Sequence, residues 1–216
     1  MPVNGSICVS NHTSPLDTLI LSKKQPFSLT GQKYSDVFSY FQKSLAECGD
    51  HLWFDRFNIN DKKHVVEVLE EHTRNKNKDP ILVFPEGTCI SNNAVMMFNK
   101  GSFEVPNAVI YPVAIKYDSR FADPFWNSSR YSLFHFIIRL ATSWGLVCDV
   151  YYLPPQVLHE GETSIEFANR VKKLIASKGQ FLNLDWNGQL KRIPPAPKHL
   201  QEQQKTISEM LVKYAE

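Results

Sequence analysis

Short apolar runs alternate with longer amphipathic stretches along the chain, and this alternation predicts an α/β fold. The apolar runs are rich in Val, Ile, Phe, Tyr and Trp, and they are short enough to be buried strands. They comprise residues 6–10, 51–54, 81–84, 109–117 and 146–153. With helices between them, the pattern favours a single domain with a mixed, largely parallel β-sheet flanked by helices. In such sheets an active site is expected at the carboxyl ends of the strands.

Capping signals place three helices between these strands. Ser14 is a suitable N-cap and Pro15 a preferred first helical residue, so one helix is expected from about residue 15 onward. A second is expected to begin after residue 60. A third begins with the capping-box pattern of residues 163–166 and is expected to stop at Gly179.

The longest apolar stretch covers residues 131–148 and is interrupted by His135 and Arg139. It does not have the uninterrupted length that a transmembrane helix needs. We interpret it as a helix that runs into a strand, with a position in the core favoured over contact with a membrane surface. Residues 193–216 are Pro-rich and then polar, and they are expected to form a tail with a peripheral helix.

Composition narrows the function classes. The 216 residues carry a net charge of +2 with a pI near 8.3, and no basic stripe interleaved with aromatic residues occurs, so nucleic acid is not an expected partner. The four cysteines lie far apart without metal-binding spacing, which is typical of thiols in a reducing compartment. A glycan on the sequon at Asn11 would block the neighbouring His12, so a catalytic His12 would have to face the cytosol.

Two motifs carry candidate acid–base chemistry. His12 precedes Asp17 by five positions, and a helix that starts between them can fold Asp17 back onto one ring nitrogen. The other nitrogen would then be free to take a proton from a hydroxyl group. Residues 84–88, Phe-Pro-Glu-Gly-Thr, follow a predicted strand, so Glu86, Gly87 and Thr88 could line the same edge of the sheet.

Two further elements could complete this site. Arg56 directly follows a predicted strand, and a guanidinium group binds phosphate in a forked geometry. Pro112 interrupts a strand pattern, which suggests a sheet edge or a bend beside a pocket. Each motif also has a purely structural explanation: Asp17 could stabilise a helix N-terminus, residues 85–88 could be a surface turn, and Arg56 could form a surface ion pair. Glycine patterns of serine hydrolases, P-loops and dinucleotide-binding folds do not occur.

The ordered set of motifs resembles the glycerolipid acyltransferase family of glycerol-3-phosphate and lysophosphatidate acyltransferases. The set comprises His12-x4-Asp17, Trp53-Phe54-Asp55-Arg56, Phe84-Pro85-Glu86-Gly87-Thr88 and Tyr111-Pro112-Val113. The endoplasmic-reticulum glycerol-3-phosphate acyltransferases of types 3 and 4 are similar to this chain at residues 86–93, 95–104, 111–117, 125–129, 142–144 and 152–155. This finer similarity extends nearly to Arg192.

The resemblance implies a reaction and a role for each site residue. An acyl group would pass from acyl-CoA to the sn-1 hydroxyl of glycerol 3-phosphate, with His12 as base and Asp17 as its partner. Arg56 would hold the phosphate, and Glu86, Gly87 and Thr88 would shape that site. Pro112 belongs to the motif linked to the acyl donor. No metal or bound cofactor is implied, because CoA arrives as part of the substrate.

The resemblance also implies surroundings for the chain. Residues 1–192 would be the catalytic domain at the endoplasmic-reticulum membrane surface, with its site facing the cytosol. Relatives carry hydrophobic segments ahead of the first motif, so the chain is expected to be truncated at its N-terminus. Two other activities stay open: acylation of a lysophospholipid such as lysophosphatidate or lysophosphatidylcholine, and an inactive lipid-binding or regulatory form. A homo-oligomer is also left open.

Overall fold

The computed structural model describes residues 1–32, 51–54 and 59–191, with a few isolated positions between residues 197 and 208. The main sheet contains β1 (Ile7–Ser10), β2 (Ser28–Gln32), β3 (Leu52–Phe54), β4 (Ile81–Val83), β6 (Ile110–Tyr117) and β7 (Cys148–Tyr152). The spatial order is β3-β2-β4-β1-β6-β7, and all neighbouring pairs are parallel except β6 with β7. The predicted mixed, largely parallel sheet is confirmed.

A small parallel sheet lies beside the main one and joins β5 (Ala94–Val95) to β8 (Leu182–Asn183). All five predicted strands are present, with ends shifted by one or two residues. In the main sheet the sequence pattern missed β2, whose residues Ser-Leu-Thr-Gly-Gln lack the apolar run of a buried strand. It also missed the two-residue strands β5 and β8 of the small sheet.

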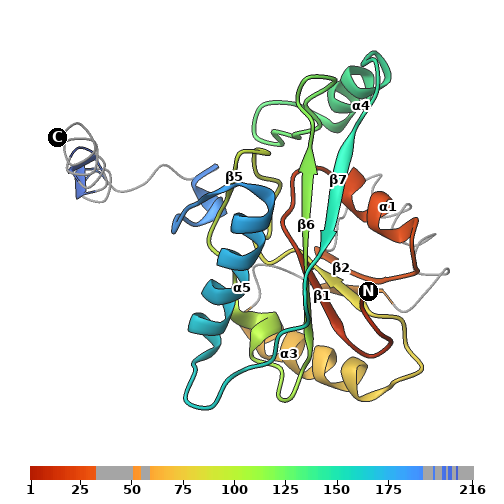
Figure 1. The fold of residues 1–216 in the computed structure, drawn as a ribbon, viewed down its shortest axis with the longest axis vertical. Coiled ribbons are helices and arrows are strands. Elements are labelled where there is room, and N and C mark those ends of the chain that lie inside the picture. Colours follow the sequence, from red (N-terminus) through yellow and green to blue (C-terminus); the bar gives the residue numbers. More distant parts are fainter. Residues whose placement is uncertain are drawn as a thin grey trace.

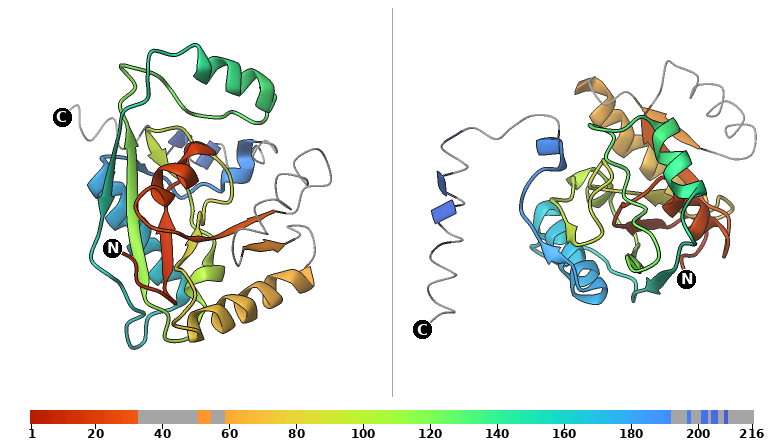
Figure 2. Two further views of the ribbon diagram at one scale, coloured as in Figure 1. Left: turned by 90° about the vertical axis from the view of Figure 1, so that its right-hand side faces the viewer. Right: turned by 90° about the horizontal axis from the view of Figure 1, so that it is seen from above.

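Helices cover both faces of the sheet (Figures 1 and 2). On one face, α5 (Ser164–Gly179) and α3 (Ile59–Arg74) pack on residues such as Ile7 and Ile81. On the other face, α1 (Leu16–Ser22) covers Cys8 and its neighbours. Because neither face of the central strands meets solvent, β1 and β4 are apolar on both sides, and they therefore stand out in the sequence as continuous runs.

The helix signals predicted the helices well but not every end. α1 begins one residue later than expected, with Pro15 at the N-cap position, so Asp17 is the second helical residue. α5 has the predicted capping box at Thr163. Gly179 is the last residue of that helix, whereas Gln180 takes the left-handed conformation with φ of 52°. Gly179 is needed for another reason: a Cβ atom there would collide with the ring of Phe181.

The helix within residues 131–148 forms, but its expected position in the core is wrong. α4 (Leu133–Ala141) runs into β7 as predicted, yet Phe136 is the one residue of the helix that is buried. Figure 1 shows α4 at one end of the molecule, beyond the carboxyl end of β6. Apolar periodicity predicts a helix but does not say whether the fold supplies a partner for each face.

Pro112 does not mark a sheet edge, because β6 lies between β1 and β7. It aligns with Val9 of β1, and its carbonyl accepts a hydrogen bond from Leu153 N at 3.0 Å. Regular pairing with β7 starts at Val113. The proline, which has no N–H to donate, therefore lies just outside the paired part of β6 and β7. The proline is therefore tolerated inside the sheet.

No helix in the described part of the chain is long and apolar enough to cross a bilayer. The predicted tail of residues 193–216 falls almost entirely outside the described residues, and its expected peripheral helix stays a prediction.

Candidate active site

Two of the predicted motifs meet at the carboxyl ends of β1 and β4. These strands are parallel neighbours, with Val9 aligned with Val83. The turn that contains His12 follows β1, and the turn that contains Glu86 follows β4. The register therefore brings both turns to the same edge of the sheet, where His12 N donates a hydrogen bond to Glu86 Oε2 at 2.8 Å.

His12 and Asp17 form the pair that the helix-start signals predicted. The Nδ1 atom of His12 lies 2.9 Å from Asp17 Oδ2. The chain folds back between them because Asp17 N donates to Ser14 O at 3.0 Å and closes the turn before α1. With Nδ1–H donating to the carboxylate, Nε2 of a neutral His12 carries the lone pair and can accept a proton.

The carboxylate of Asp17 is fully buried and fully hydrogen-bonded. Its Oδ2 atom also accepts from Thr13 N at 2.7 Å and Ser14 N at 2.9 Å, and its Oδ1 atom accepts from the hydroxyl of Tyr117. A buried carboxylate is tolerated only when donors replace the water that it loses. These donors fix the orientation of Asp17 and, through it, the ring of His12.

Glu86 connects the two motifs through backbone contacts. Its side chain is only 2% exposed; Oε2 accepts from His12 N, and Oε1 accepts from Met96 N at 2.8 Å. The pKa of Glu86 is raised to about 7. Burial is the main cause and outweighs the two backbone hydrogen bonds, which lower this pKa. Glu86 therefore positions the backbone of the base, with both carboxylate oxygens engaged by this chain.

The ring of His12 is held between an aromatic side chain and a thiol. It stacks on Phe84, with 4.1 Å between ring centroids and 19° between planes. Its Nε2 atom lies 3.4 Å from Cys89 Sγ. His12 O also accepts from Ile90 N at 2.7 Å, so the motif after β4 contacts both the backbone and the side chain of His12. Cys89 thus occupies the position next to the nitrogen that a base would use.

Opposing influences act on the pKa of His12. Burial lowers it, whereas the electrostatic influence of Cys89 and the hydrogen bonds with Asp17 and Cys89 raise it, and the net result is about 10. A His12 with Cys89 at its Nε2 atom therefore tends to hold a proton. Removal of Cys89 from that position would lower the pKa toward the range useful for a base near neutral pH.

Gly87 and Thr88 form the turn after Glu86. Gly87 has φ of 67°, which a residue with a side chain rarely adopts, and its N–H donates to Phe84 O at 3.0 Å. Thr88 is half-buried and lies against Gly188. A side chain at Gly188 would collide with Thr88, because its Cβ atom would be 2.8 Å from the Thr88 methyl carbon. The segment after β8 therefore packs closely against this turn.

The remaining predicted site residues are placed differently. Arg56 lies outside the described residues, so its expected position next to the His12–Asp17 pair stays a prediction. Pro112 is buried inside β6, next to the strand that leads to His12.

Three residues that the sequence reasoning did not select support the site. Tyr117 is separated from Asp17 by 100 positions, and no local pattern links them. Asn11 exchanges hydrogen bonds of 2.9 Å with Ile115 N and O, and so continues the β1–β6 pairing with its side chain. Asn11 is 2% exposed, which leaves no room for a glycan in the folded chain. Cys89 was not among the predicted site residues, although its place directly after Thr88 indicated that it lies near the site.

Within the described residues, no group of three or more His, Cys, Asp or Glu side chains could hold a metal ion.

Comparisons with known proteins identify the family of the chain. The model of the family described as Acyltransferase matches residues 2–116, which is more than half of the chain. The chain is 49% identical to glycerol-3-phosphate acyltransferase 3 of Rattus norvegicus, over 98% of this chain and 46% of that protein. It is 47% identical to glycerol-3-phosphate acyltransferase 4 of Homo sapiens, over 98% and 46% of the two chains. The chain thus spans about half the length of the curated relatives it matches.

Among solved structures, the fold is similar to the 1-acyl-sn-glycerophosphate (LPA) acyltransferase PlsC from Thermotoga maritima. The TM-score is 0.52, with 16% identity, over 83% of this chain and 66% of that one. At this identity the likeness shows the fold alone. The sheet and the paired turns define an α/β protein with a candidate acid–base site at its strand ends. The family comparison makes this class specific: the chain belongs to the Acyltransferase family.

Proposed function

We propose that this chain transfers a fatty acyl group from acyl-CoA to the sn-1 hydroxyl of glycerol 3-phosphate, giving lysophosphatidic acid for phospholipid and triacylglycerol synthesis. The observation that carries the proposal is the His12–Asp17 pair, held at the strand ends by buried hydrogen bonds. Similarity over nearly the whole chain to glycerol-3-phosphate acyltransferases 3 and 4 supports this choice of acceptor.

In the proposed reaction His12 Nε2 takes the proton of the sn-1 hydroxyl, while Asp17 holds Nδ1–H and stabilises the imidazolium. The hydroxyl oxygen attacks the carbonyl carbon of the thioester, and the bond between that carbon and the CoA sulfur breaks. The leaving thiolate takes the proton back from His12. The products are 1-acyl-glycerol 3-phosphate and CoA, and this chemistry needs no metal or bound cofactor.

The acceptor must replace Cys89 as the partner of His12 Nε2, since the thiol lies 3.4 Å from that atom. This exchange also removes an influence that raises the pKa of His12. The base therefore becomes competent when the hydroxyl arrives.

The other site residues have supporting roles in the proposal. Arg56 binds the phosphate of the acceptor. Gly87 and Thr88 shape that subsite, and Glu86 does so through the backbone of His12. Pro112 contributes to the binding of the acyl donor.

We place the reaction at the endoplasmic-reticulum membrane, with the site facing the cytosol. Two observations support this placement. The Asn11 sequon is buried, so its glycosylation is incompatible with the fold. Cys8 and Cys148 are free thiols, as expected in a reducing compartment.

The test is acyl transfer from labelled palmitoyl-CoA, with glycerol 3-phosphate and lysophosphatidate offered separately to the wild-type chain and to His12→Ala. We expect product from glycerol 3-phosphate with the wild type and none with the variant. Product from lysophosphatidate alone would overturn the acceptor and keep the reaction class. Equal product from His12→Ala, with an unchanged melting temperature, would overturn the role of the base.

A further inference from the structure

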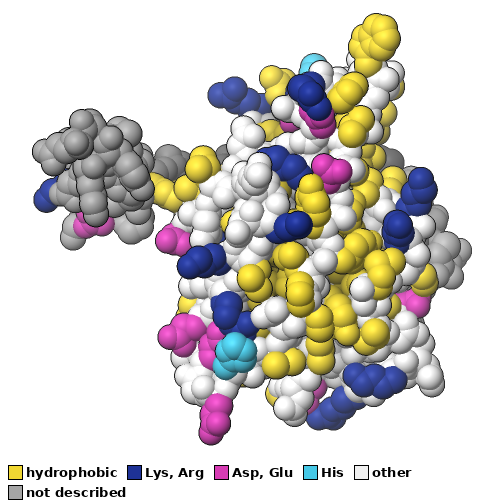
Figure 3. Space-filling view, viewed as in Figure 1, with side chains coloured by type: hydrophobic (Ala, Val, Ile, Leu, Met, Phe, Trp, Pro, Cys, Tyr) yellow, Lys and Arg dark blue, Asp and Glu magenta, His cyan; other side chains and the backbone are white. Residues whose placement is uncertain are grey.

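Apolar side chains gather on the outside of α4 and on the turn that follows it. They form what we call the α4 surface: Phe134, Ile137, Ile138, Trp144, Leu146 and Val147. Trp144 is 98% exposed and Phe134 74% exposed, values that are unusual for large apolar side chains in water. Figure 3 shows hydrophobic side chains protruding at this end of the molecule, next to Lys and Arg side chains.

The helix has two apolar faces, and only one of them is packed. Leu133, Phe136 and Leu140 lie on the inner face, where Phe136 is 5% exposed. Phe134, Ile137 and Ile138 follow helical spacing on the outer face and are 74, 51 and 47% exposed. The described part of the chain leaves the outer apolar residues largely uncovered, and these residues therefore point to a partner.

The chemistry around the α4 surface fits an anionic bilayer surface. Residues 130–147 contain Arg130 and Arg139 and no Asp or Glu. Arg139 lies beside the outer apolar residues of α4. Its Nη2 atom is 3.4 Å from Asp123 Oδ2, in an ion pair whose side chains are both 47% exposed. Tyr131 and Trp144 stand next to the stripe, and aromatic rings of this kind are enriched where hydrocarbon meets headgroups. An apolar stripe flanked by arginines is typical of helices that lie in the interface of a membrane.

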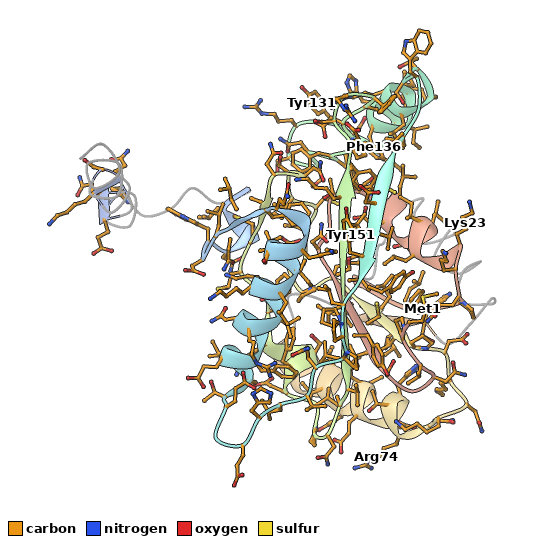
Figure 4. All side chains as sticks on the ribbon, in the orientation of Figure 1. Met1, Lys23, Arg74, Tyr131, Phe136 and Tyr151 are labelled. Atoms are coloured by element: carbon orange, nitrogen blue, oxygen red, sulfur yellow. The ribbon has the colours of Figure 1, made fainter. Side chains whose placement is uncertain are left out.

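The α4 surface lies over the end of the sheet that carries the candidate active site. The ring of Phe136 packs against Trp126, with 5.9 Å between centroids. Trp126 N donates to the carbonyl of Thr13, the residue after His12, at 3.4 Å. Figure 4 shows Tyr131 and Phe136 beyond the ends of β6 and β7 on this side. A membrane that touches α4 would therefore face the strand ends.

We propose that the α4 surface docks this chain onto the surface of an anionic lipid bilayer, with the outer face of α4 and Trp144 among the acyl chains and Arg130 and Arg139 among the headgroups. The partner is a bilayer because residues 130–147 combine apolar, aromatic and cationic side chains and contain no Asp or Glu, and the nearby Asp123 is paired with Arg139. The link to catalysis rests on the proposed function: the bilayer supplies long-chain acyl-CoA and receives the acylated product beside the strand ends.

The test is flotation of the full chain with vesicles of phosphatidylcholine and phosphatidylserine, and with vesicles of phosphatidylcholine alone. The variant Phe134→Ser/Ile137→Ser/Ile138→Ser removes the outer face and leaves Phe136 in place. The matched control is Val157→Ser/Ile165→Ser/Leu174→Ser, at apolar residues that are 50, 58 and 37% exposed elsewhere on the molecule. We expect the α4 variant to lose vesicle affinity by roughly tenfold or more, and the control to bind as the wild type does.

A second variant tests the charges. Arg130→Gln/Arg139→Gln should reduce the preference for phosphatidylserine vesicles while leaving weak binding to neutral vesicles. Equal binding by the wild type and the α4 variant would overturn the proposal, as would failure of the wild type to float. A wild-type dimer in solution that the α4 variant dissociates, without vesicle binding, would instead make this surface a protein interface.

The same measurements separate this inference from the proposed function. His12→Ala should bind vesicles as the wild type does, because His12 is not part of the α4 surface. Binding without any acyl transfer would count against the proposed function alone. Transfer from short-chain, water-soluble acyl-CoA without vesicle binding would count against the docking surface alone.

Discussion

The proposed catalytic turn, residues 10–17, and α4 differ in which kind of side chain they bury. In the catalytic turn polar groups are buried: Asn11 and Asp17 are 2 and 0% exposed, and both are hydrogen-bonded. In α4 apolar groups are exposed, and Phe136 alone is buried. Burial of polar groups costs free energy unless each finds a partner, and exposure of apolar groups costs free energy unless something covers them. The first arrangement is complete within this chain, and the second points outside it.

This difference predicts how substitutions should behave. A change in the catalytic turn removes a partner from a buried group and should reduce both stability and transfer. A change on the outer face of α4 should leave the folded chain intact and affect only binding to a partner.

The largest effect is expected for Asp17→Asn. The amide can no longer satisfy the donors of His12, Thr13, Ser14 and Tyr117 together, so the free energy of unfolding should fall by about 3 kcal/mol. Acyl transfer should fall by roughly 10³-fold to 10⁴-fold because His12 loses the partner that orients it. Urea denaturation and the rate of transfer measure the two effects. A variant that keeps both values would remove Asp17 from the proposed pair.

Tyr117→Phe sharpens the comparison within the buried set. The substitution deletes the hydroxyl that donates to Asp17 and should cost about 2 kcal/mol, because the acceptor is a buried charge. It should also lower kcat with little change in KM, since Tyr117 touches Asp17 and not the substrate. The control is Tyr152→Phe, whose buried hydroxyl has no hydrogen-bond partner in the described part of the chain and should be dispensable. Equal losses in both variants would contradict a specific role for Tyr117.

Cys89→Ala should change the pH dependence of transfer. His12 must be neutral to act as a base, so activity rises with pH through the pKa of His12. Cys89 raises that pKa, and its removal should shift the acid limb of the pH–rate profile to lower pH. Cys148→Ala, a thiol in β7, is the control and should leave the limb in place. An unshifted limb in Cys89→Ala would show that the thiol does not govern the titration of the base.

The smallest effect is expected on α4. Trp144→Ser replaces a side chain that is 98% exposed, so the free energy of unfolding should change by no more than about 0.5 kcal/mol. Thermal melting of Trp144→Ser and Asp17→Asn, measured together, compares the loss of stability in the two variants directly. A large loss of stability in Trp144→Ser would mean that the exposed surface supports the fold.

The same contrast explains what could be predicted from the sequence. The β1 and β4 runs, the start of α1 to within one residue and the His12–Asp17 pair depend on neighbours within a few positions, and these were predicted. Tyr117 reaches Asp17 only because β6 pairs with β1, and this cannot be read locally. The exposure of α4 was missed for the same reason, because its apolar pattern is that of a core helix. The position of Arg56 stays a prediction.

The most direct test of the central claim is the rate of transfer from palmitoyl-CoA to glycerol 3-phosphate by His12→Ala, with its melting temperature measured beside it. The proposal predicts a loss of roughly 10³-fold or more, because the base is gone, in a chain that still folds. Transfer within a few-fold of the wild type by a folded His12→Ala chain would contradict it.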